Sequence, residues 1–227
     1  MEKFNIKSLV GFMCTFLFIT FINFSQAFAQ EPLNSYKING IFDDTKKILT
    51  ANEVVSFNNN YGEYLKEIVF HLYPDSYNSP ETIPSIGDGK PLKLTEEEIG
   101  DIQINNVLVN NEKIPFSQEN QILKINLKES LNPNENLQIS LDFTLKLPHN
   151  TQRLGYFEDV YSFTNWYPIL SIYNPVSNTW DETPFYPIGE SNYSQSSNYD
   201  VTLEMPKAML VASTGIDKKV TLKNEKK

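Results

Sequence analysis

The sequence predicts an all-β domain built from antiparallel strands. The clearest indication is the segment from Leu137 to Leu147, where apolar residues occupy every second position and polar residues stand between them. Because successive side chains of a strand point to opposite faces, this segment has one buried side and one solvent-facing side. Weaker alternation recurs elsewhere, and clusters of Asn, Pro and Gly separate the alternating segments. Both features are typical of antiparallel sheets.

The remaining strands follow from the shorter alternating segments, which in chain order span Glu53–Phe57, Ile68–Leu72, Ile102–Val109, Leu123–Leu127 and Tyr199–Met205. The turns between strands are expected at Asn58–Gly62, Asn110–Asn111 and Asn132–Asn134. Asn tolerates left-handed backbone and Pro fixes φ, so each cluster can reverse the chain. We therefore expect a meander in which strands adjacent in sequence pair with one another.

Three other segments carry weaker signals. Residues 74–91 are rich in Pro, Ser and Gly and predict a long surface loop. Thr95 and Glu98 have the spacing of a helix capping box, although Gly100 follows too soon for more than a short helical turn. Val220-Thr221-Leu222 is expected to begin another alternating strand.

Residues 148–198 lose the alternation and are dense in Tyr, Phe, Trp, Pro and Asn. An irregular stretch of this length within a compact domain indicates either a functional loop or an interface. We favour an interface with another domain, because exposed aromatic rings at this density would promote aggregation. Another domain is therefore expected to cover the rings of Tyr167, Tyr173, Trp180, Phe185 and Tyr186.

The first 29 residues predict a secretory signal peptide. Lys3 and Lys7 precede an apolar run from Leu9 to Phe24, and Ala27-Phe28-Ala29 supplies a small-x-small cleavage pattern. The alternative is an uncleaved membrane anchor, but the run is shorter than the ~20 residues that span a bilayer. The mature chain, residues 30–227, is thus expected to be secreted or extracellular without stable membrane insertion, and its attachment to the cell surface stays open.

Composition limits the partners of this chain. The formal net charge is -9, which argues against nucleic acid and anionic membrane surfaces. With 40% hydrophobic and 13% aromatic residues, the chain has too much apolar material for a disordered acidic tail. The single cysteine, Cys14, lies in the signal segment, so the mature domain must rely on its hydrophobic core without disulfides.

Several short motifs follow one another in an order that resembles the N-terminal β-domain of aminopeptidase N type zinc metallopeptidases. They are YKI and FD at 36–38 and 42–43, LKEIVFHLYP at 65–74, LP and RLG at 147–148 and 153–155, NWYP at 165–168, and YDVTL and MPK at 199–203 and 205–207. The resemblance extends from Tyr36 to about Thr221. The Trp-Tyr-Pro form of the motif at 166–168 is similar to a bacterial, often exported, branch of the family.

This resemblance implies an antiparallel, saddle-like β-sandwich of about eight or more strands with long aromatic loops. In such enzymes the domain precedes a thermolysin-like catalytic domain and closes one side of its active-site cleft. The family's zinc motif, H-E-x-x-H, begins at neither of the two histidines, His71 and His149. We therefore expect a chain truncated before its catalytic domain, inactive alone, with no catalytic residue and no metal or other cofactor of its own.

The expected partner is that catalytic domain, in cis or as a split gene product, and zinc is expected only there. A peptide substrate would be bound only in that context. The resemblance implies that an acidic or amide side chain ahead of the last strand holds the free α-amine of the substrate. A carboxylate suits an ammonium group because charge-assisted hydrogen bonds are strong. Glu190 and, alternatively, Gln195 lie in this part of the chain, and a solvated loop carboxylate is the plainer interpretation of Glu190.

Other candidate residues do not support a catalytic site. His71 alternates with Phe70 and Leu72, so we expect it on the solvent-facing side without a metal role. Ser196-Ser197 lacks a nucleophile elbow. Two further functions stay open: a free-standing secreted β-sandwich that binds peptide or carbohydrate through residues 166–193, and a degenerate remnant without a present role.

Overall fold

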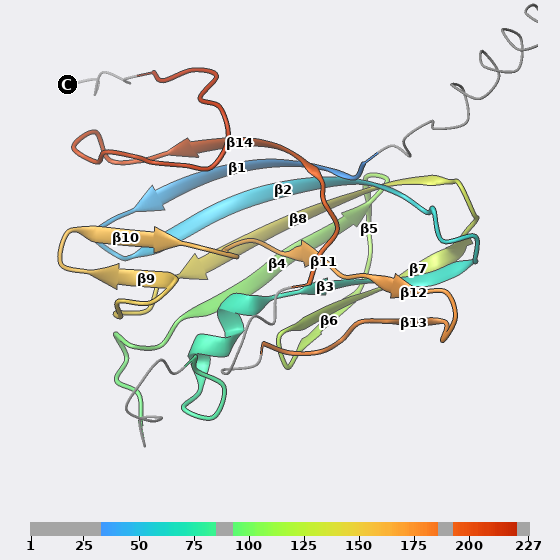
Figure 1. The fold of residues 1–227 in the computed structure, drawn as a ribbon, viewed down its shortest axis with the longest axis horizontal. Coiled ribbons are helices and arrows are strands. Elements are labelled where there is room, and N and C mark those ends of the chain that lie inside the picture. Colours follow the sequence, from blue (N-terminus) through green and yellow to red (C-terminus); the bar gives the residue numbers. More distant parts are fainter. Residues whose placement is uncertain (1–32, 85–92, 186–192, 222–227) are drawn as a thin grey trace, which may run out of the picture. The chain divides into compact units, whose positions relative to one another are not determined.

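The computed structural model describes residues 33–84, 93–185 and 193–221. Within these ranges the chain is almost entirely β-structure, with one short 3-10 helix, η1 (Tyr73–Asn78), so the predicted all-β class is confirmed (Figure 1). None of its helical segments is both long and apolar enough to cross a bilayer. The predicted signal peptide, residues 1–29, and the candidate Glu190 lie outside the described residues.

The larger sheet has six strands in the order β14-β1-β2-β8-β4-β5. Their bounds are β1 Ser35–Asp43, β2 Ile48–Asn58, β4 Asp101–Val109, β5 Glu112–Lys113, β8 Asn136–Lys146 and β14 Asn198–Glu204. Strand β8 lies at the centre and pairs along its full length with β2. This strand corresponds to the most regular alternation in the sequence, and its inward positions from Leu137 to Leu145 are all buried.

The second sheet has four strands in the order β11-β3-β7-β6, and two separate hairpins complete the fold. The sheet strands are β3 Leu65–His71, β6 Phe116–Glu119, β7 Ile122–Leu131 and β11 Ile169–Leu170. The hairpins are β9 Leu154–Phe157 with β10 Val160–Phe163, and β12 Tyr173–Asn174 with β13 Thr179–Trp180.

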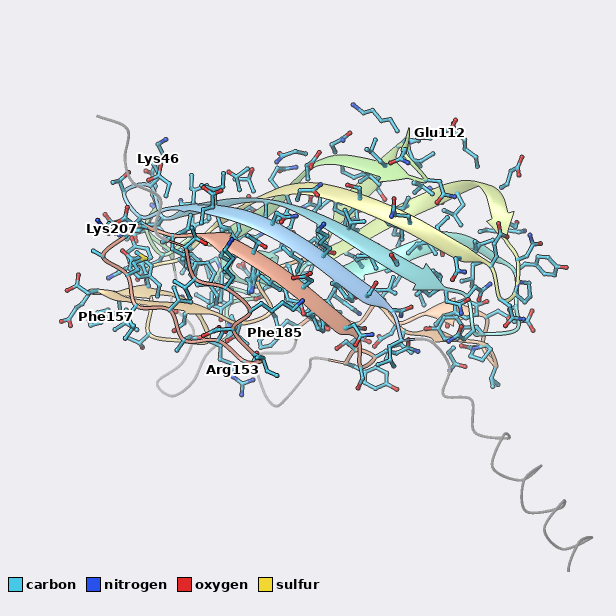
Figure 2. All side chains as sticks on the ribbon, turned by 90° about the horizontal axis from the view of Figure 1, so that it is seen from above. Lys46, Glu112, Arg153, Phe157, Phe185 and Lys207 are labelled. Atoms are coloured by element: carbon cyan, nitrogen blue, oxygen red, sulfur yellow. The ribbon has the colours of Figure 1, made fainter. Side chains whose placement is uncertain are left out.

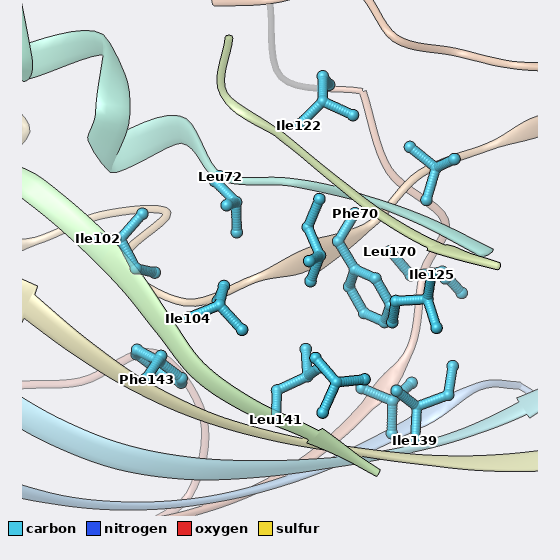
Figure 3. Close-up of a cluster of buried hydrophobic side chains, with 14 of the residues drawn as sticks. Phe70, Leu72, Ile102, Ile104, Ile122, Ile125, Ile139, Leu141, Phe143 and Leu170 are labelled. Carbon is cyan, nitrogen blue, oxygen red and sulfur yellow. The ribbon is translucent and has the colours of Figure 1, made fainter. Parts of the chain in front are cut away.

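The two sheets face each other across one hydrophobic core. Figure 3 shows Ile139, Leu141 and Phe143 of β8 pointing toward the side chains of the second sheet. Phe70 of β3 and Ile125 of β7 meet them from the other side and are fully buried. The predicted one-sided burial of alternating strands therefore comes from a sandwich of two packed sheets.

The chain does not form the predicted simple meander. The hairpin at Asn110–Asn111 joins β4 to β5, and both Asn residues adopt the left-handed backbone that such a turn requires. By contrast, Asn58–Gly62 leads from β2 to β3 in the other sheet, and Asn132–Asn134 leads back from β7 to β8. The buried Asn59 side chain joins these two crossings, because its Nδ2 donates to the carbonyls of Glu63, Leu131 and Asn132.

One strand pair departs from the antiparallel prediction. Strand β14 pairs with β1 in parallel, from Ser35 opposite Asn198 to Ile41 opposite Glu204. The two strands lie side by side at the edge of the larger sheet in both views (Figures 1 and 2). The rings of Tyr36 and Tyr199 stack across this pair with centroids 4.8 Å apart.

The first residues of the predicted surface loop are instead buried, because η1 packs under the larger sheet. Its Asp75 carboxylate accepts hydrogen bonds from the Ile102 backbone N–H at 3.0 Å and from Gln118 Nε2 at 3.1 Å. Half of the capping box is present: Glu98 reaches back and its Oε2 accepts from the Thr95 backbone N–H and hydroxyl. The Glu98 N–H donates to the Thr95 carbonyl instead of the hydroxyl, and only a turn follows. The predicted strand at 220–222 was wrong for Val220 and Thr221, which are irregular, and Leu222 lies outside the described residues.

Candidate functional site

An open groove of about 820 Å³ lies in the aromatic segment that carried no regular pattern in the sequence. The β12-β13 hairpin and the residues that follow it supply one side, and Tyr193 contributes from the segment leading to β14. The Tyr173-Trp180 cross-strand pair sets the position of the hairpin. The groove therefore brings together residues that are separated in the sequence, including Asp181, Glu182 and Tyr193.

Two buried rings form the base of the groove. Trp180 is 6% exposed and donates its indole N–H to the carbonyl of Glu67, 3.1 Å away, while Tyr173 is 8% exposed. The Tyr61 ring contacts both of them, and its hydroxyl accepts the Tyr173 backbone N–H. Phe57 of β2 lies behind Trp180. The base is thus fixed by strands β2 and β3 of the two sheets.

These contacts correct the prediction that another domain must cover the aromatic segment. Tyr173 and Trp180 are covered by residues of the same chain, and the half-buried Tyr167 packs against Tyr36 and Tyr199. Phe185 is also half-buried, and its ring contacts Tyr73 edge to face. Tyr186 lies outside the described residues. The prediction was wrong for Tyr173 and Trp180, because the β12-β13 hairpin packs both rings inward. For the half-buried Tyr167 and Phe185 it stays a prediction.

Two carboxylates line the groove, and they differ in their partners. Glu182 Oε2 lies 2.6 Å from Lys124 Nζ, which forms an ion pair with it. Asp181 accepts a hydrogen bond from the Thr183 backbone N–H at 2.9 Å, and no lysine or arginine of the described ranges pairs with it. Burial acts to raise the pKa of Asp181, but the bonds from Thr183 and the nearby His71 outweigh it and lower the pKa. Asp181 is therefore a carboxylate at neutral pH without a cationic partner in the described structure.

His71 lies beside this acidic pair, and its predicted solvent-facing position was wrong. Its side chain is 1% exposed, and its ring stacks on Tyr73 with centroids 5.0 Å apart. Neither ring nitrogen has a hydrogen-bond partner among the residues that the structure describes. Burial lowers the pKa of His71 and outweighs the attraction of Asp181 and Glu182. The prediction failed because the end of β3 is covered on both faces, so alternation there does not distinguish inside from outside.

The two predicted amine-binding residues occupy different situations. Glu190 lies outside the described residues, but the segments on either side of it end at the groove. The Phe185 backbone N–H donates to Gln121 Oε1 at 3.0 Å, and the backbone of Tyr193 hydrogen-bonds the Tyr73 hydroxyl. Gln195 does not line the groove. Its amide links Asn34, whose Nδ2 donates to Oε1, to the Tyr61 hydroxyl, which accepts from Nε2.

Sequence reasoning missed Asp181 and Glu182 as candidate site residues. The available signal was an acidic pair directly after a tryptophan in an aromatic segment, which is weak because exposed carboxylates are common. Within the described ranges, no three or more His, Cys, Asp or Glu side chains are arranged to hold a metal ion. The chemistry that the groove offers is aromatic surface, hydrogen bonds and the Asp181 carboxylate.

Comparison with known proteins gives partial matches only. No protein-family model matches the chain, and no curated protein matches it. Among solved structures, an M1 zinc metallopeptidase from Deinococcus radiodurans matches at 14% identity with a TM-score of 0.36, covering 51% of this chain and 20% of that one. A two-domain M1 zinc metallopeptidase mutant bound to L-arginine matches at 14% identity and a TM-score of 0.36, covering 54% and 22%. The chain thus spans 20% to 22% of the length of these proteins.

Proposed function

We propose that this chain is the non-catalytic β-domain of an exported zinc-dependent aminopeptidase, in which it forms one wall of the active-site cleft and helps to position the amino-terminal end of a peptide. The ordered motifs from Tyr36 to about Thr221 motivate the family assignment. The single observation that carries the binding role is the groove at Asp181, where a carboxylate without a lysine or arginine partner among the described residues lies beside aromatic rings.

The chemistry of the groove suits a peptide ammonium group. A carboxylate accepts shorter and stronger hydrogen bonds from an ammonium than from a neutral donor. Aromatic faces add a further attraction for cations when the ring lies within reach. Lys124 already neutralises Glu182, so Asp181 is the carboxylate left to pair with an incoming cation. Glu190 and Gln195 stay proposed as further amine-binding side chains.

In this proposal the chain contributes binding and no chemistry of its own. Zinc and the residues that activate water would come from a partner catalytic domain, in cis or as a separate product. The purified chain is therefore expected to show no chelator-sensitive hydrolysis of aminoacyl reporter substrates when zinc is added. Chelator-sensitive hydrolysis by the purified chain alone would contradict the proposal that zinc and the catalytic residues belong to a partner domain.

The second candidate function is a free-standing secreted module that binds a peptide or a carbohydrate. A sugar-binding platform needs an exposed ring face, which Tyr193 supplies, whereas Trp180 and Tyr173 are almost fully buried. The Asp181 carboxylate, without a lysine or arginine partner among the described residues, is what favours a peptide amino terminus over a carbohydrate. The coding sequence downstream separates the two functions, because an H-E-x-x-H motif within about 150 codons would favour the aminopeptidase domain.

The binding role is tested with one tripeptide prepared with a free and with an acetylated amino terminus. We expect only the free form to perturb the NMR signals of the groove residues, and Asp181→Asn to weaken its binding by at least about tenfold, since a hydrogen bond to a charged group contributes about 1.5–3 kcal/mol. Asp142→Asn is the matched control, because Asp142 lies on the outward face of β8 and bonds Asn52 and Asn106. Equal binding of both peptide forms would refute the proposal.

A further inference from the structure

A carboxyl group lies inside the apolar core without a partner. Glu53 belongs to β2 and projects from the same face as Val55 and Phe57, with Ile38 and Leu141 opposite it on the neighbouring strands. Its side chain is 0% exposed, and neither carboxyl oxygen has a hydrogen-bond partner in the described structure. A buried polar group without a hydrogen bond is costly, so its presence calls for a physical explanation.

The residues over this part of β2 belong to an irregular stretch of the aromatic segment. We call residues 164–168, which join β10 to β11, the cover segment. The Trp166 ring contacts Phe143 of β8 at 6.3 Å, and the Tyr167 ring contacts Tyr36 of β1 at 5.9 Å between centroids. Tyr36 lies opposite Val55 and Phe143 lies opposite Ala51, so the two ring contacts fall on either side of Glu53 along β2. The cover segment therefore packs over this part of β2.

The cover segment is held much more weakly than the strands beneath it. Residues 164–168 make no backbone-to-backbone hydrogen bond with any other residue in the described ranges. Packing of the Trp166 and Tyr167 rings holds them, and the paired strands β10 and β11 anchor their two ends. Strand β2, by contrast, is paired on both sides along nine or more residues. Local detachment of the cover is thus easier than disruption of the sheet.

Among the residues that the structure describes, no positive charge compensates the ionisation of Glu53. The titratable groups that interact with it are the hydroxyls of Tyr36 on β1 and Tyr167 on the cover segment. Burial raises the pKa of both tyrosines, and they are neutral throughout the physiological range. Burial likewise raises the pKa of Glu53 well above its ordinary value, so the packed state favours the neutral carboxyl.

We propose that residues 164–168 form a proton-controlled cover, which packs on β2 while Glu53 is neutral and detaches when Glu53 ionises. The sign follows from the burial of an acid. The packed state binds the proton more tightly than the open state does, so packing is complete at low pH and is lost as the pH rises through the pKa of the packed state. Detachment would admit water to the carboxylate and expose the inward faces of Tyr36 and Phe143.

The test uses Trp166 as the reporter, because the chain contains two tryptophans and Trp180→Phe leaves Trp166 alone. Acrylamide quenching of Trp166 is measured from about pH 5 to about pH 9, with circular dichroism of the β-structure in the same samples. We expect the quenching constant to rise at least about twofold toward high pH while the β-signal stays constant. Glu53→Gln and Glu53→Met, each in the Trp180→Phe background, should abolish this rise.

Two variants of Glu53 keep the test decisive if one of them folds poorly, because Met is apolar and of similar length. Asp142→Asn, on the opposite face of the same sheet, is the matched control and should reproduce the rise. Three results would overturn the proposal: a constant quenching constant in the parent chain, the same rise in either folded Glu53 variant, or a rise that coincides with loss of the β-signal. Each of them would mean that the cover does not respond locally to Glu53.

Discussion

Replacement of Asp75 by Asn should lower the free energy of unfolding at acid pH and raise it above neutral pH. Burial raises the pKa of Asp75 from 3.8 to about 7, with the neighbouring Asp101 carboxyl adding to the rise and the bonds from Ile102 and Gln118 opposing it. The folded protein therefore retains a proton on Asp75 that the unfolded chain releases near pH 3.8. Stability from this group is complete below that pH and is lost as the pH rises toward 7.

The magnitude follows from the size of the shift. The shift spans about three pH units, and each unit corresponds to about 1.4 kcal/mol, so ionisation of Asp75 lowers the free energy of unfolding by about 4 kcal/mol. Asn at this position keeps an acceptor for the Ile102 N–H but loses the oxygen that accepts from Gln118, which costs about 1 kcal/mol. The variant should thus be about 1 kcal/mol less stable at acid pH and about 3 kcal/mol more stable above pH 7.

Urea unfolding followed by circular dichroism at several pH values measures this difference. Subtraction of the two curves cancels the titration of groups that do not interact with Asp75, so the difference reports Asp75 together with its neighbour Asp101. Asp142→Asn provides the comparison, because Asp142 lies on the outward face of β8. The reasoning is refuted if the Asp75→Asn difference stays constant between about pH 4 and about pH 8.

Three further outcomes follow from other contacts. Trp180→Ala should lower the free energy of unfolding by about 3–5 kcal/mol, because it removes a buried ring and leaves a cavity, whereas Trp180→Phe should lower it less; chemical denaturation measures both. Asn111→Gly should be tolerated and Asn111→Ala should destabilise by about 1 kcal/mol, since position 111 has a φ of 67°; equal midpoints for the two variants would contradict this. Bonds from Thr95 lower the pKa of Glu98, so the stability that Glu98 contributes is present above its ordinary pKa and is lost as the pH falls. The melting temperature of Glu98→Gln should therefore lie below that of the parent chain at neutral pH and converge with it in acid.

The sequence predicts strands most accurately where the alternation is long and one face is wet. Strand β8 satisfies both conditions from Leu137 to Leu145, and its prediction was correct. Strand β1 was missed because Gly40 interrupts the apolar positions at Tyr36, Ile38 and Phe42. A glycine fits there because a Cβ would lie only 3.0 Å from a methyl of Leu203 on β14. This close approach depends on a strand far away in sequence, so no local pattern contains it.

The candidate site was predictable only as a region. The density of rings between residues 148 and 198 indicated where it lies, but which rings are buried depends on Tyr61 and Phe57, which belong to the start of the domain. On strand β2, the alternation of inward and outward positions and the polarity of the residues give conflicting predictions. The alternation that places Val55 and Phe57 inside places Glu53 there as well, yet its charge argues for solvent. The polarity of a side chain therefore predicts burial poorly at a residue such as Glu53, which is a buried acid in an apolar core.

The parallel pairing of β1 with β14 has a consequence for folding kinetics. Strand β1 is the first strand of the described structure and β14 the last, so this contact joins the two described strands that are farthest apart in the sequence. Contacts between residues far apart in the sequence form slowly, because the entropic cost of closing a long loop comes before the contact stabilises the fold. During synthesis, one side of β1 would stay without its neighbour until almost the entire domain had emerged, and an edge strand in that condition is open to pairing with other chains. The yield of soluble protein should depend on how quickly this last neighbour arrives.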